Sequence, residues 1–256
     1  MKISIITVSY NSGHTISDTI DSVLRQTYPH IEYIIIDGAS TDNTIEIIKS
    51  YGNSIHTFIS EPDNGLYDAI NKGILLATGG IVGILNSDDF FASPDIINSI
   101  ANAFEQEKTD VLFGDVAYVK PLQTDKIIRY YSSGKFSIRK FAKGYMPAHP
   151  TFYIKRELYL QFGLYKTTYK IAADFEFMTR LLHTNNIRYK YIPMLFVFMR
   201  IGGISNRNPK NIYLANKEIV RACKENGIST NLAILALKYF SKMFEFVTPL
   251  KKIRSK

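Results

Sequence analysis

The chain has 256 residues, of which 46% are hydrophobic and 21% charged. This is an ordinary composition for a soluble protein, and the length suits one large α/β domain or one domain with an accessory segment. No apolar run approaches the roughly 18 residues that span a bilayer, and the apolar run at the N-terminus is shorter than the roughly 7 to 15 residues of a signal peptide. The single cysteine, Cys223, excludes an intramolecular disulfide framework and favours a reducing compartment, so we expect a cytoplasmic protein.

The formal net charge of +8 is concentrated at the C-terminal end of the chain. Residues 231–256 hold six basic residues and one acid, which is +5 of the total, so the rest is nearly neutral. A nucleic-acid-binding protein would spread basic and aromatic residues over one face. The distribution therefore argues against a nucleic-acid partner.

The first half of the chain alternates strand-like and helical patterns, which predicts parallel βαβ units. We expect strands at residues 3–8, 33–36, 56–60 and 81–85, separated by helices whose apolar residues recur with helical spacing. Ser93 and Pro94 are expected to open a further helix as its N-cap and first residue.

The pattern changes after Asp110. Strands are expected at residues 110–119 and 126–131, a helix at 173–183, further strands near Tyr189 and Leu195, and two closing helices. The fold class is thus α/β, with a mostly parallel, Rossmann-like sheet flanked by helices and a C-terminal helical extension.

Polar residues follow each of the first four predicted strands. They are Ser9 to Asn11, Asp37, residues 61–65, and residues 86–89. Ligands of an open parallel sheet bind beyond the carboxyl ends of its strands, so these residues form a candidate site. Neither GxxxxGK[ST] nor GxGxxG is present, so a nucleotide here would need carboxylates and a hard cation, Mn²⁺ or Mg²⁺, in place of a glycine-rich phosphate loop.

Six ordered segments resemble the inverting family 2 glycosyltransferases of the GT-A fold. They are SIITVSYN, IIIDGASTDNT, EPDNGLYDAINKG, LNSDD, HPTFYI and AADFEFMTRL, followed by a weaker GGIS. The resemblance covers about residues 3 to 205 and is greatest to bacterial enzymes that extend lipid-linked O-antigen or exopolysaccharide units.

The resemblance implies roles in donor binding. Asp37 matches the acid that reads the nucleotide base, with Thr7, Ser9 and Asn11 beside it. Asp63 and Lys72 match positions near the ribose and phosphates, and Ser87 and Asp88 belong to the segment that holds the nucleotide-sugar.

Asp88 also matches the second carboxylate of the family's DxD metal motif. Asn86 replaces the first, and Gly38 stands where a second Asp is often found. The loss of one charge leaves the metal to Asp88, with Asp89 as a further candidate, and predicts weak metal affinity without the donor diphosphate.

Asp174 matches the catalytic base. An inverting transfer needs one carboxylate to take the acceptor proton, and Glu176 is the competing candidate. Residues two apart do not share a helix face, so only one should reach the acceptor. The resemblance also places His149 near the junction of donor and acceptor.

The implied reaction moves a sugar, a hexose from a UDP-sugar, to a lipid-linked saccharide, such as a polyprenyl-diphosphate-linked one, and forms a β linkage. Residues 1–205 would form the catalytic domain, with a nucleotide-binding half (1–110) and an acceptor-binding half (111–205). The alternatives are another metal-dependent nucleotide-using enzyme, such as a nucleotidyltransferase, and a non-enzymatic binding protein. The segment from Ser9 to Gly13 has no basic residue, which disfavours a nucleotidyltransferase.

Residues 206–256 are expected to form a helical, basic, amphipathic segment. Apolar residues cover most of a helix over 234–247, and a basic cluster follows. This predicts association with an anionic membrane surface, on the inner face of the cell membrane. The alternative is a helix that packs on the catalytic domain.

Overall fold

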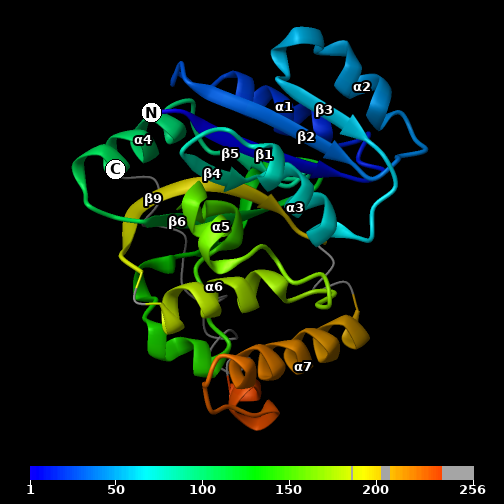
Figure 1. Ribbon diagram of the computed structural model, residues 1–256. Helices are drawn as coiled ribbons and strands as arrows, with labels where there is room; N and C mark the ends of the chain where they lie inside the picture. Colours follow the sequence, from blue (N-terminus) through cyan, green and yellow to red (C-terminus); the bar gives the residue numbers. More distant parts are fainter. Residues whose placement is uncertain (186, 203–207, 238–256) are drawn as a thin grey trace.

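The computed structural model describes residues 1–185, 187–202 and 208–237 (Figure 1). Its strands are β1 (Ile3–Ser9), β2 (Ile31–Asp37), β3 (Thr57–Ser60), β4 (Ile81–Ile84), β5 (Phe90–Phe91), β6 (Val111–Lys120), β7 (Gln123–Tyr131), β8 (Tyr153–Lys155) and β9 (Tyr189–Arg200). Its α-helices are α1 (Ile16–Leu24), α2 (Thr44–Ser50), α3 (Leu66–Leu76), α4 (Ile96–Gln106), α5 (Arg156–Phe162), α6 (Ala173–Thr184) and α7 (Pro209–Glu225), and short 3₁₀ turns include η4 (His149–Thr151). No helix in these ranges is long and apolar enough to cross a membrane.

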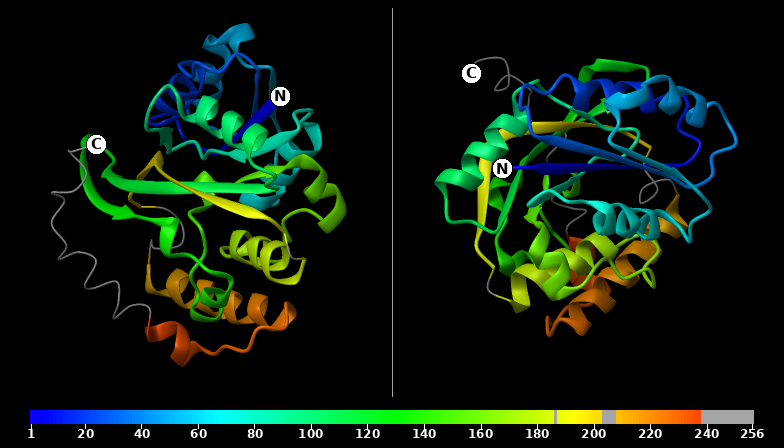
Figure 2. Two further views of the ribbon diagram at one scale, coloured as in Figure 1. Left: turned by 90° about the vertical axis from the view of Figure 1, so that its left-hand side faces the viewer. Right: turned by 45° about the horizontal axis from the view of Figure 1, so that its top comes forward.

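One sheet runs through the molecule in the order β3-β2-β1-β4-β8-β6-β9-β5, with β7 also paired to β6. The first four strands of this order are parallel, as expected. The second half is mixed, because β8 runs antiparallel to both β4 and β6 while β9 runs parallel to β6. In Figure 2, β6 and β7 (green) extend beside β9 (yellow). The first four strands of this order thus form a parallel unit, and the remaining strands pair in both directions.

Alternating side chains of β1 and β2 supply two cores, one on each face of the sheet. Ile3, Ile5, Tyr33 and Ile35 pack toward α1, α2 and α4, whereas the intervening residues pack toward α3 and α6. Strands buried on both faces read as continuous apolar runs, which is why ISIITV and YIII stand out in the sequence.

Two local predictions were wrong, and three elements were not predicted. Helix α4 begins at Ile96 after the N-cap Asp95, and Ser93 and Pro94 lie in the preceding turn. The strands expected near Tyr189 and Leu195 are one strand, β9, because its pairing with β6 continues through a bulge between Phe113 and Asp115. Strands β5 and β8 were not predicted because strands of two or three residues carry no periodic pattern. Helix α5 was also not predicted.

The described part of the C-terminal segment packs against the preceding part of the chain. Helix α7 packs along α6, and its Ile219, Ala222 and Cys223 join the core that contains α3 and α6. Leu235, part of the expected membrane-facing stripe, is also fully buried in this core. Residues 208–237 therefore match the alternative of packing on the domain. The rest of the basic amphipathic segment lies outside the described residues.

A buried carboxylate joins the amino ends of three parallel strands. Glu32 of β2 accepts hydrogen bonds from Ser4 Oγ on β1 at 2.6 Å and from Thr78 N, just before β4, at 2.8 Å, and its ion pair with Lys2 spans 2.8 Å. Burial alone would raise the pKa of Glu32, but the hydrogen bonds from Lys2, Ser4 and Thr78 lower the pKa to about 2.

Glu32→Gln should lower the free energy of unfolding at pH 7. A carboxyl whose folded pKa is depressed stabilises the fold above its unfolded pKa, and that stabilisation is lost as pH falls from the ordinary value of 4.5 toward 2. We expect a loss on the order of 2 kcal/mol at pH 7, shrinking below about pH 4, in urea unfolding at a series of pH values. Glu46→Gln, on the exposed face of α2, is the matched control. Equal losses at pH 7 and pH 2.5 would contradict this account.

Candidate active site

The carboxyl ends of β1, β2 and β3 meet at Asp37. Its Oδ1 accepts hydrogen bonds from the hydroxyls of Ser9 (2.9 Å) and Ser40, and its Oδ2 from Ser40 N (2.9 Å) and the hydroxyl of Ser60 (2.8 Å). The side chain is fully buried. A carboxylate has about four acceptor positions, and all four are filled from within the chain. In this structure Asp37 organises the strand ends and offers no oxygen to a ligand.

The loops after the strands are joined to one another by further polar contacts. Asn11 adopts a left-handed backbone conformation (φ 49°), accepts a hydrogen bond from Thr41 N and donates its own N–H to Ser40. The hydroxyl of Ser12 lies 2.7 Å from that of Ser87, in the loop after β4. Ser9, Asn11, Asp37 and Ser87 therefore lie together at one edge of the sheet.

Asp63 presents a carboxylate oxygen beside the end of β2. Its Oδ1 accepts a hydrogen bond from Gly65 N at 2.8 Å. A Cβ at Gly38 would lie 2.5 Å from Asp63 Oδ2 and 3.4 Å from the Tyr10 ring, so Asp63 occupies the space that a side chain at position 38 would need. Tyr10 is 65% exposed. An exposed ring and a half-buried carboxylate thus adjoin at this edge.

Two other residues that were predicted to bind the nucleotide-sugar, Thr7 and Lys72, lie away from this edge or are paired within the chain. Thr7 is fully buried within the sheet, and its hydroxyl lies 3.1 Å from that of Tyr33, so it does not reach the surface of the site. Lys72 of α3 forms an ion pair with Glu61 at 2.8 Å and donates to the Pro62 carbonyl at 3.2 Å. Lys72 therefore braces the segment that carries Asp63.

The turn after β4 separates the two neighbouring carboxylates. Asp88 is half-buried, whereas Asp89 is 1% exposed and lies 3.5 Å from Asn86 Nδ2. Burial raises the pKa of Asp88, an effect that Arg200 opposes, and burial together with the charge of Asp88 raises the pKa of Asp89 well above its usual range. Arg200 forms an ion pair with Asp18 and donates to the Asp88 carbonyl at 2.8 Å, which fixes the turn. Asp88 is thus the accessible carboxylate of the pair.

The same turn contains an unsatisfied oxygen. Asn86 Oδ1 is buried and has no hydrogen-bond partner among the described residues. With the Asp88 carboxylate it makes two oxygen donors two residues apart, a set that suits Mg²⁺ or Mn²⁺. The described ranges contain no group of three or more His, Cys, Asp or Glu side chains able to hold a metal. The residues fit a cation that takes its other ligands from elsewhere, such as a diphosphate.

Asp174 lies in the first turn of α6 and contacts α3. Its Oδ1 accepts hydrogen bonds from Phe175 N at 2.8 Å and from Tyr67 Oη at 3.4 Å, and Tyr67 also donates to the Ile171 carbonyl at 2.5 Å. Burial raises the pKa of Asp174, while His149 and the hydrogen bonds from Phe175 and Tyr67 act in the opposite direction. Because Tyr67 is four residues after Asp63, this contact joins the second half of the chain to the strand-end site.

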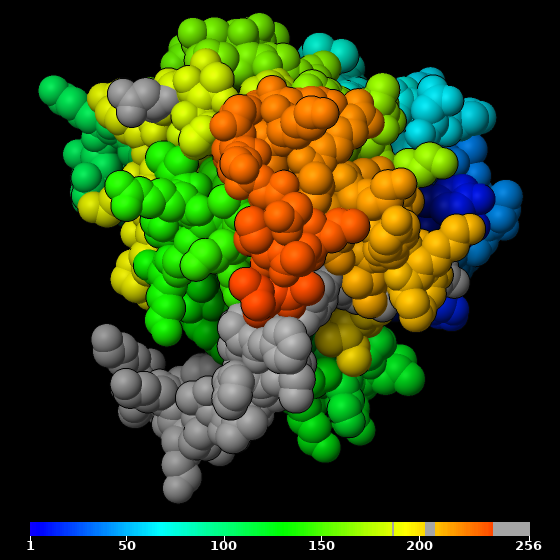
Figure 3. All heavy atoms as spheres, turned by 90° about the horizontal axis from the view of Figure 1, so that it is seen from below, coloured from blue at the N-terminus to red at the C-terminus, as the bar shows by residue number. Residues whose placement is uncertain are grey.

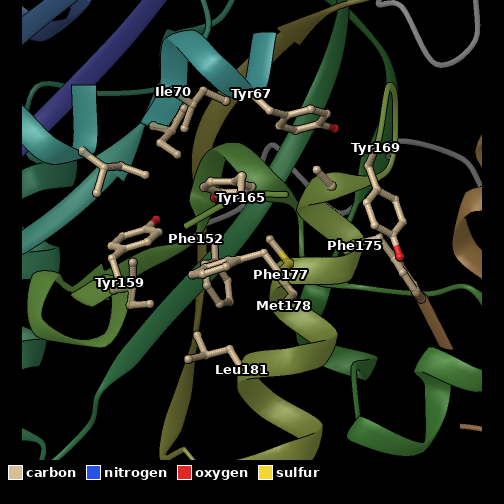
Figure 4. Close-up of a cluster of buried hydrophobic side chains, with 14 of the residues drawn as sticks. Tyr67, Ile70, Phe152, Tyr159, Tyr165, Tyr169, Phe175, Phe177, Met178 and Leu181 are labelled. Atoms are coloured by element: carbon tan, nitrogen blue, oxygen red, sulfur yellow. The ribbon is translucent and has the colours of Figure 1, made fainter. Parts of the chain in front are cut away.

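Aromatic side chains surround this carboxyl group. Tyr67 and Tyr165 stack with their ring centroids 5.9 Å apart, and Tyr165 also packs against Phe177 of α6 with centroids 4.7 Å apart (Figure 4). His149, at the start of η4, places Nε2 3.2 Å from Tyr165 Oη. Burial lowers the pKa of His149, and the negative charge of Asp174 opposes this effect. His149 and Asp174 thus belong to one half-buried polar group next to aromatic side chains.

Glu176 has a different environment. It is fully buried, with ion pairs to Lys166 at 2.8 Å and Arg180 at 3.0 Å. The competitor of Asp174 therefore points into the domain and is neutralised there. The sequence argument that the two carboxylates cannot share a helix face agrees with this arrangement.

Sequence reasoning missed four residues of the site. Ser40 and Tyr67 lie within the quoted segments and Ser60 directly precedes one of them, so their positions could have indicated a place in the site. Arg200 comes just before GGIS and had only weak support.

Comparisons with known proteins place this geometry in a family. Residues 4–162 match the model of glycosyl transferase family 2. A PGL/p-HBAD biosynthesis glycosyltransferase of Mycobacterium tuberculosis is 28% identical over 237 residues, covering 90% of this chain and 86% of that protein. A putative teichuronic acid biosynthesis glycosyltransferase, TuaG of Bacillus subtilis, is 43% identical over 90 residues, covering 34% of this chain and 36% of that protein. The chain therefore belongs to glycosyl transferase family 2 and is a glycosyltransferase.

The fold has solved counterparts. Residues 1–349 of TarS from S. aureus, in complex with UDP, superpose with a TM-score of 0.66 at 20% identity, covering 98% of this chain and 77% of that one. In a longer TarS structure the match covers all of this chain and 46% of that one. The expected GT-A fold is confirmed.

Tyr67→Phe should raise the pKa of the Asp174 carboxyl group further, because the lost hydroxyl donates to the ionised form. Titration of the carboxyl carbon by ¹³C NMR measures this directly. Tyr51→Phe is the matched control, since the Tyr51 hydroxyl donates to Asp21 at 2.9 Å, on α1 rather than α6. An unchanged or lower pKa in Tyr67→Phe would show that the 3.4 Å contact does not stabilise the carboxylate.

Proposed function

We propose that the protein transfers a hexose from a UDP-sugar to a hydroxyl of a lipid-linked saccharide, with inversion at the anomeric carbon, during synthesis of a bacterial surface polysaccharide such as O-antigen or exopolysaccharide. Asp174 is the base. The observation that carries the proposal is the contact of Asp174 with Tyr67, which holds one carboxyl group next to the strand-end site while Glu176 is paired and buried.

The reaction is a single displacement. Asp174 takes the proton of the acceptor hydroxyl, the acceptor oxygen bonds to the anomeric carbon, and the bond to the nucleoside diphosphate breaks on the opposite face. An α-linked donor therefore gives a β-linked product. Burial raises the pKa of Asp174, which brings the carboxylate closer in basicity to the task of a general base.

For the nucleotide-sugar donor, we assign recognition of the nucleotide base to Asp63 rather than Asp37. The four acceptor positions of Asp37 are filled, whereas Asp63 Oδ2 borders Gly38 and the exposed Tyr10 ring. A carboxylate oxygen there accepts a ring N–H, as uracil provides, and TarS, which shares the fold, was solved with UDP and with UDP-GlcNAc. Asp88 and Asn86 would hold Mn²⁺ or Mg²⁺, which would offset the charge of the departing diphosphate.

The acceptor class rests on the relatives. TuaG is described as a putative teichuronic acid biosynthesis glycosyltransferase and the mycobacterial relative as a PGL/p-HBAD biosynthesis glycosyltransferase, so cell-surface glycans are the common theme. A lipid-linked, polyprenyl-diphosphate-type acceptor lies at the membrane. We propose peripheral attachment on the cytoplasmic face through the basic residues of 238–256, which hold four basic side chains in the last six positions.

Donor binding should depend on a divalent cation. In a thermal-shift screen of UDP-, GDP- and dTDP-sugars, we expect stabilisation by a UDP-sugar with Mn²⁺ and little with EDTA. Asp88→Asn should lose this cation-dependent shift and lower transfer by about 10² or more. Asp68→Asn, a half-buried carboxylate of α3, is the control. Full donor binding and transfer in excess EDTA would refute the metal assignment.

Asp174→Asn should lower transfer by about 10² to 10⁴ while the donor Kd changes less than about twofold, because the carboxylate acts only as the acceptor proton moves. Glu176→Gln should instead lower the melting temperature, since it breaks buried ion pairs with Lys166 and Arg180. Single-turnover assays measure the transfer rates, thermal unfolding measures the melting temperatures, and NMR of the product's anomeric proton reports its configuration. A retained anomeric configuration, or a greater loss of rate in folded Glu176→Gln, would overturn the mechanism.

A further inference from the structure

Glu218 of α7 binds the backbone that leads into α6. Its Oε1 accepts a hydrogen bond from Lys170 N at 2.8 Å, and its Oε2 accepts from Ile171 N at 2.9 Å and Ala172 N at 2.8 Å. The side chain is 7% exposed. Three consecutive N–H groups thus converge on one buried carboxylate from a distant part of the sequence.

This carboxylate holds the segment that enters α6. Ala172 occupies the N-cap position of α6 and has no side-chain oxygen to accept from the first turn. The N–H groups that Glu218 binds belong to residues 170–172, just before the first helical residue, Ala173. The start of a helix also carries a partial positive charge, which a nearby carboxylate stabilises. Glu218 therefore fixes the path of the backbone into α6.

The same three residues connect Glu218 to Asp174. The Ile171 N–H bonds to Glu218, and the Ile171 carbonyl accepts from Tyr67 Oη, which also donates to Asp174. The peptide before Asp174 is therefore held from α7 on one side and from α3 on the other. Figure 4 shows Tyr67 above the start of α6, and Figure 3, seen from below, shows α7 (orange) on the lower face of the molecule.

We propose that Glu218 is a positioning residue for Asp174: by binding the N–H groups of residues 170–172, it holds the carboxyl of the catalytic base in place against Tyr67. This inference rests on the proposed function of Asp174 and extends the site to a helix beyond residues 4–162, the range that matches the family model.

The test compares Glu218→Gln, which loses the charge, with Glu218→Asp, which keeps the charge but shortens the reach. Glu225→Gln is the matched control, because Glu225 lies on the same helix and bonds the side chains of Lys166 and Arg221. Three quantities are measured for each full-length variant: the melting temperature, the Asp174 pKa by carboxyl ¹³C NMR, and kcat and KM with the UDP-sugar that stabilises the wild-type protein.

In Glu218→Gln we expect the Asp174 pKa to fall toward its ordinary value, because a loosened first turn admits water, and kcat to fall about tenfold or more while the donor KM stays within about twofold. Glu218→Asp should be intermediate, and Glu225→Gln should match the wild type in the Asp174 pKa, kcat and KM. Folded Glu218 variants with wild-type kcat and an unshifted Asp174 would overturn the proposal, leaving a stabilising role only.

Two further outcomes also decide between the alternatives. If Glu218→Gln does not fold, Glu218→Asp, which retains the carboxylate, tests the proposal through the same three measurements. If the wild-type protein binds none of the nucleotide-sugars, the proposed function fails, and the titration of Asp174 still shows whether Glu218 sets its environment.

Discussion

The site depends on the buried carboxylate of Asp37. Parallel strands bring polar residues to one edge, but the backbone alone does not fix the loops that follow. Asp37 does so with four hydrogen bonds to Ser9, Ser40 and Ser60, so the ends of three strands share one acceptor. Burying a charge is costly unless it is fully hydrogen-bonded, and this requirement favours one arrangement of the edge over alternatives.

A second constraint explains why the sheet changes character in its middle. The antiparallel β8 connects β4 to β6 and directs the chain from η4 into α5 and α6. His149 and Asp174 consequently lie near the same α3 helix that follows Asp63. A purely parallel continuation would add another strand end to the row, whereas the mixed half supplies a separate group of residues facing the first.

Sequence patterns predicted the parallel half well because each element there has a clear period and a polar terminus. The strand over residues 33–36 and the helix after Asp63 are examples. The same sequence patterns did not predict the tertiary contacts of those elements. Whether the acceptor positions of the Asp37 carboxylate are all filled depends on Ser60, which is 23 residues away and is brought beside Asp37 by the register of β2 and β3. The burial of Glu176 likewise depends on Lys166, before α6, and is invisible in an i, i+2 spacing.

The C-terminal helix shows how a site extends beyond its recognisable motifs. Residues 4–162 carry the family signature and the donor-side carboxylates, but both Asp174 and Glu218 lie after them. A carboxyl group proposed to accept a proton needs a rigid backbone around it, and a helix start with an alanine N-cap does not provide that rigidity by itself. Glu218 binds that backbone from α7. The core around Ile219 and Cys223 holds α7, so under this proposal the same core also positions Asp174.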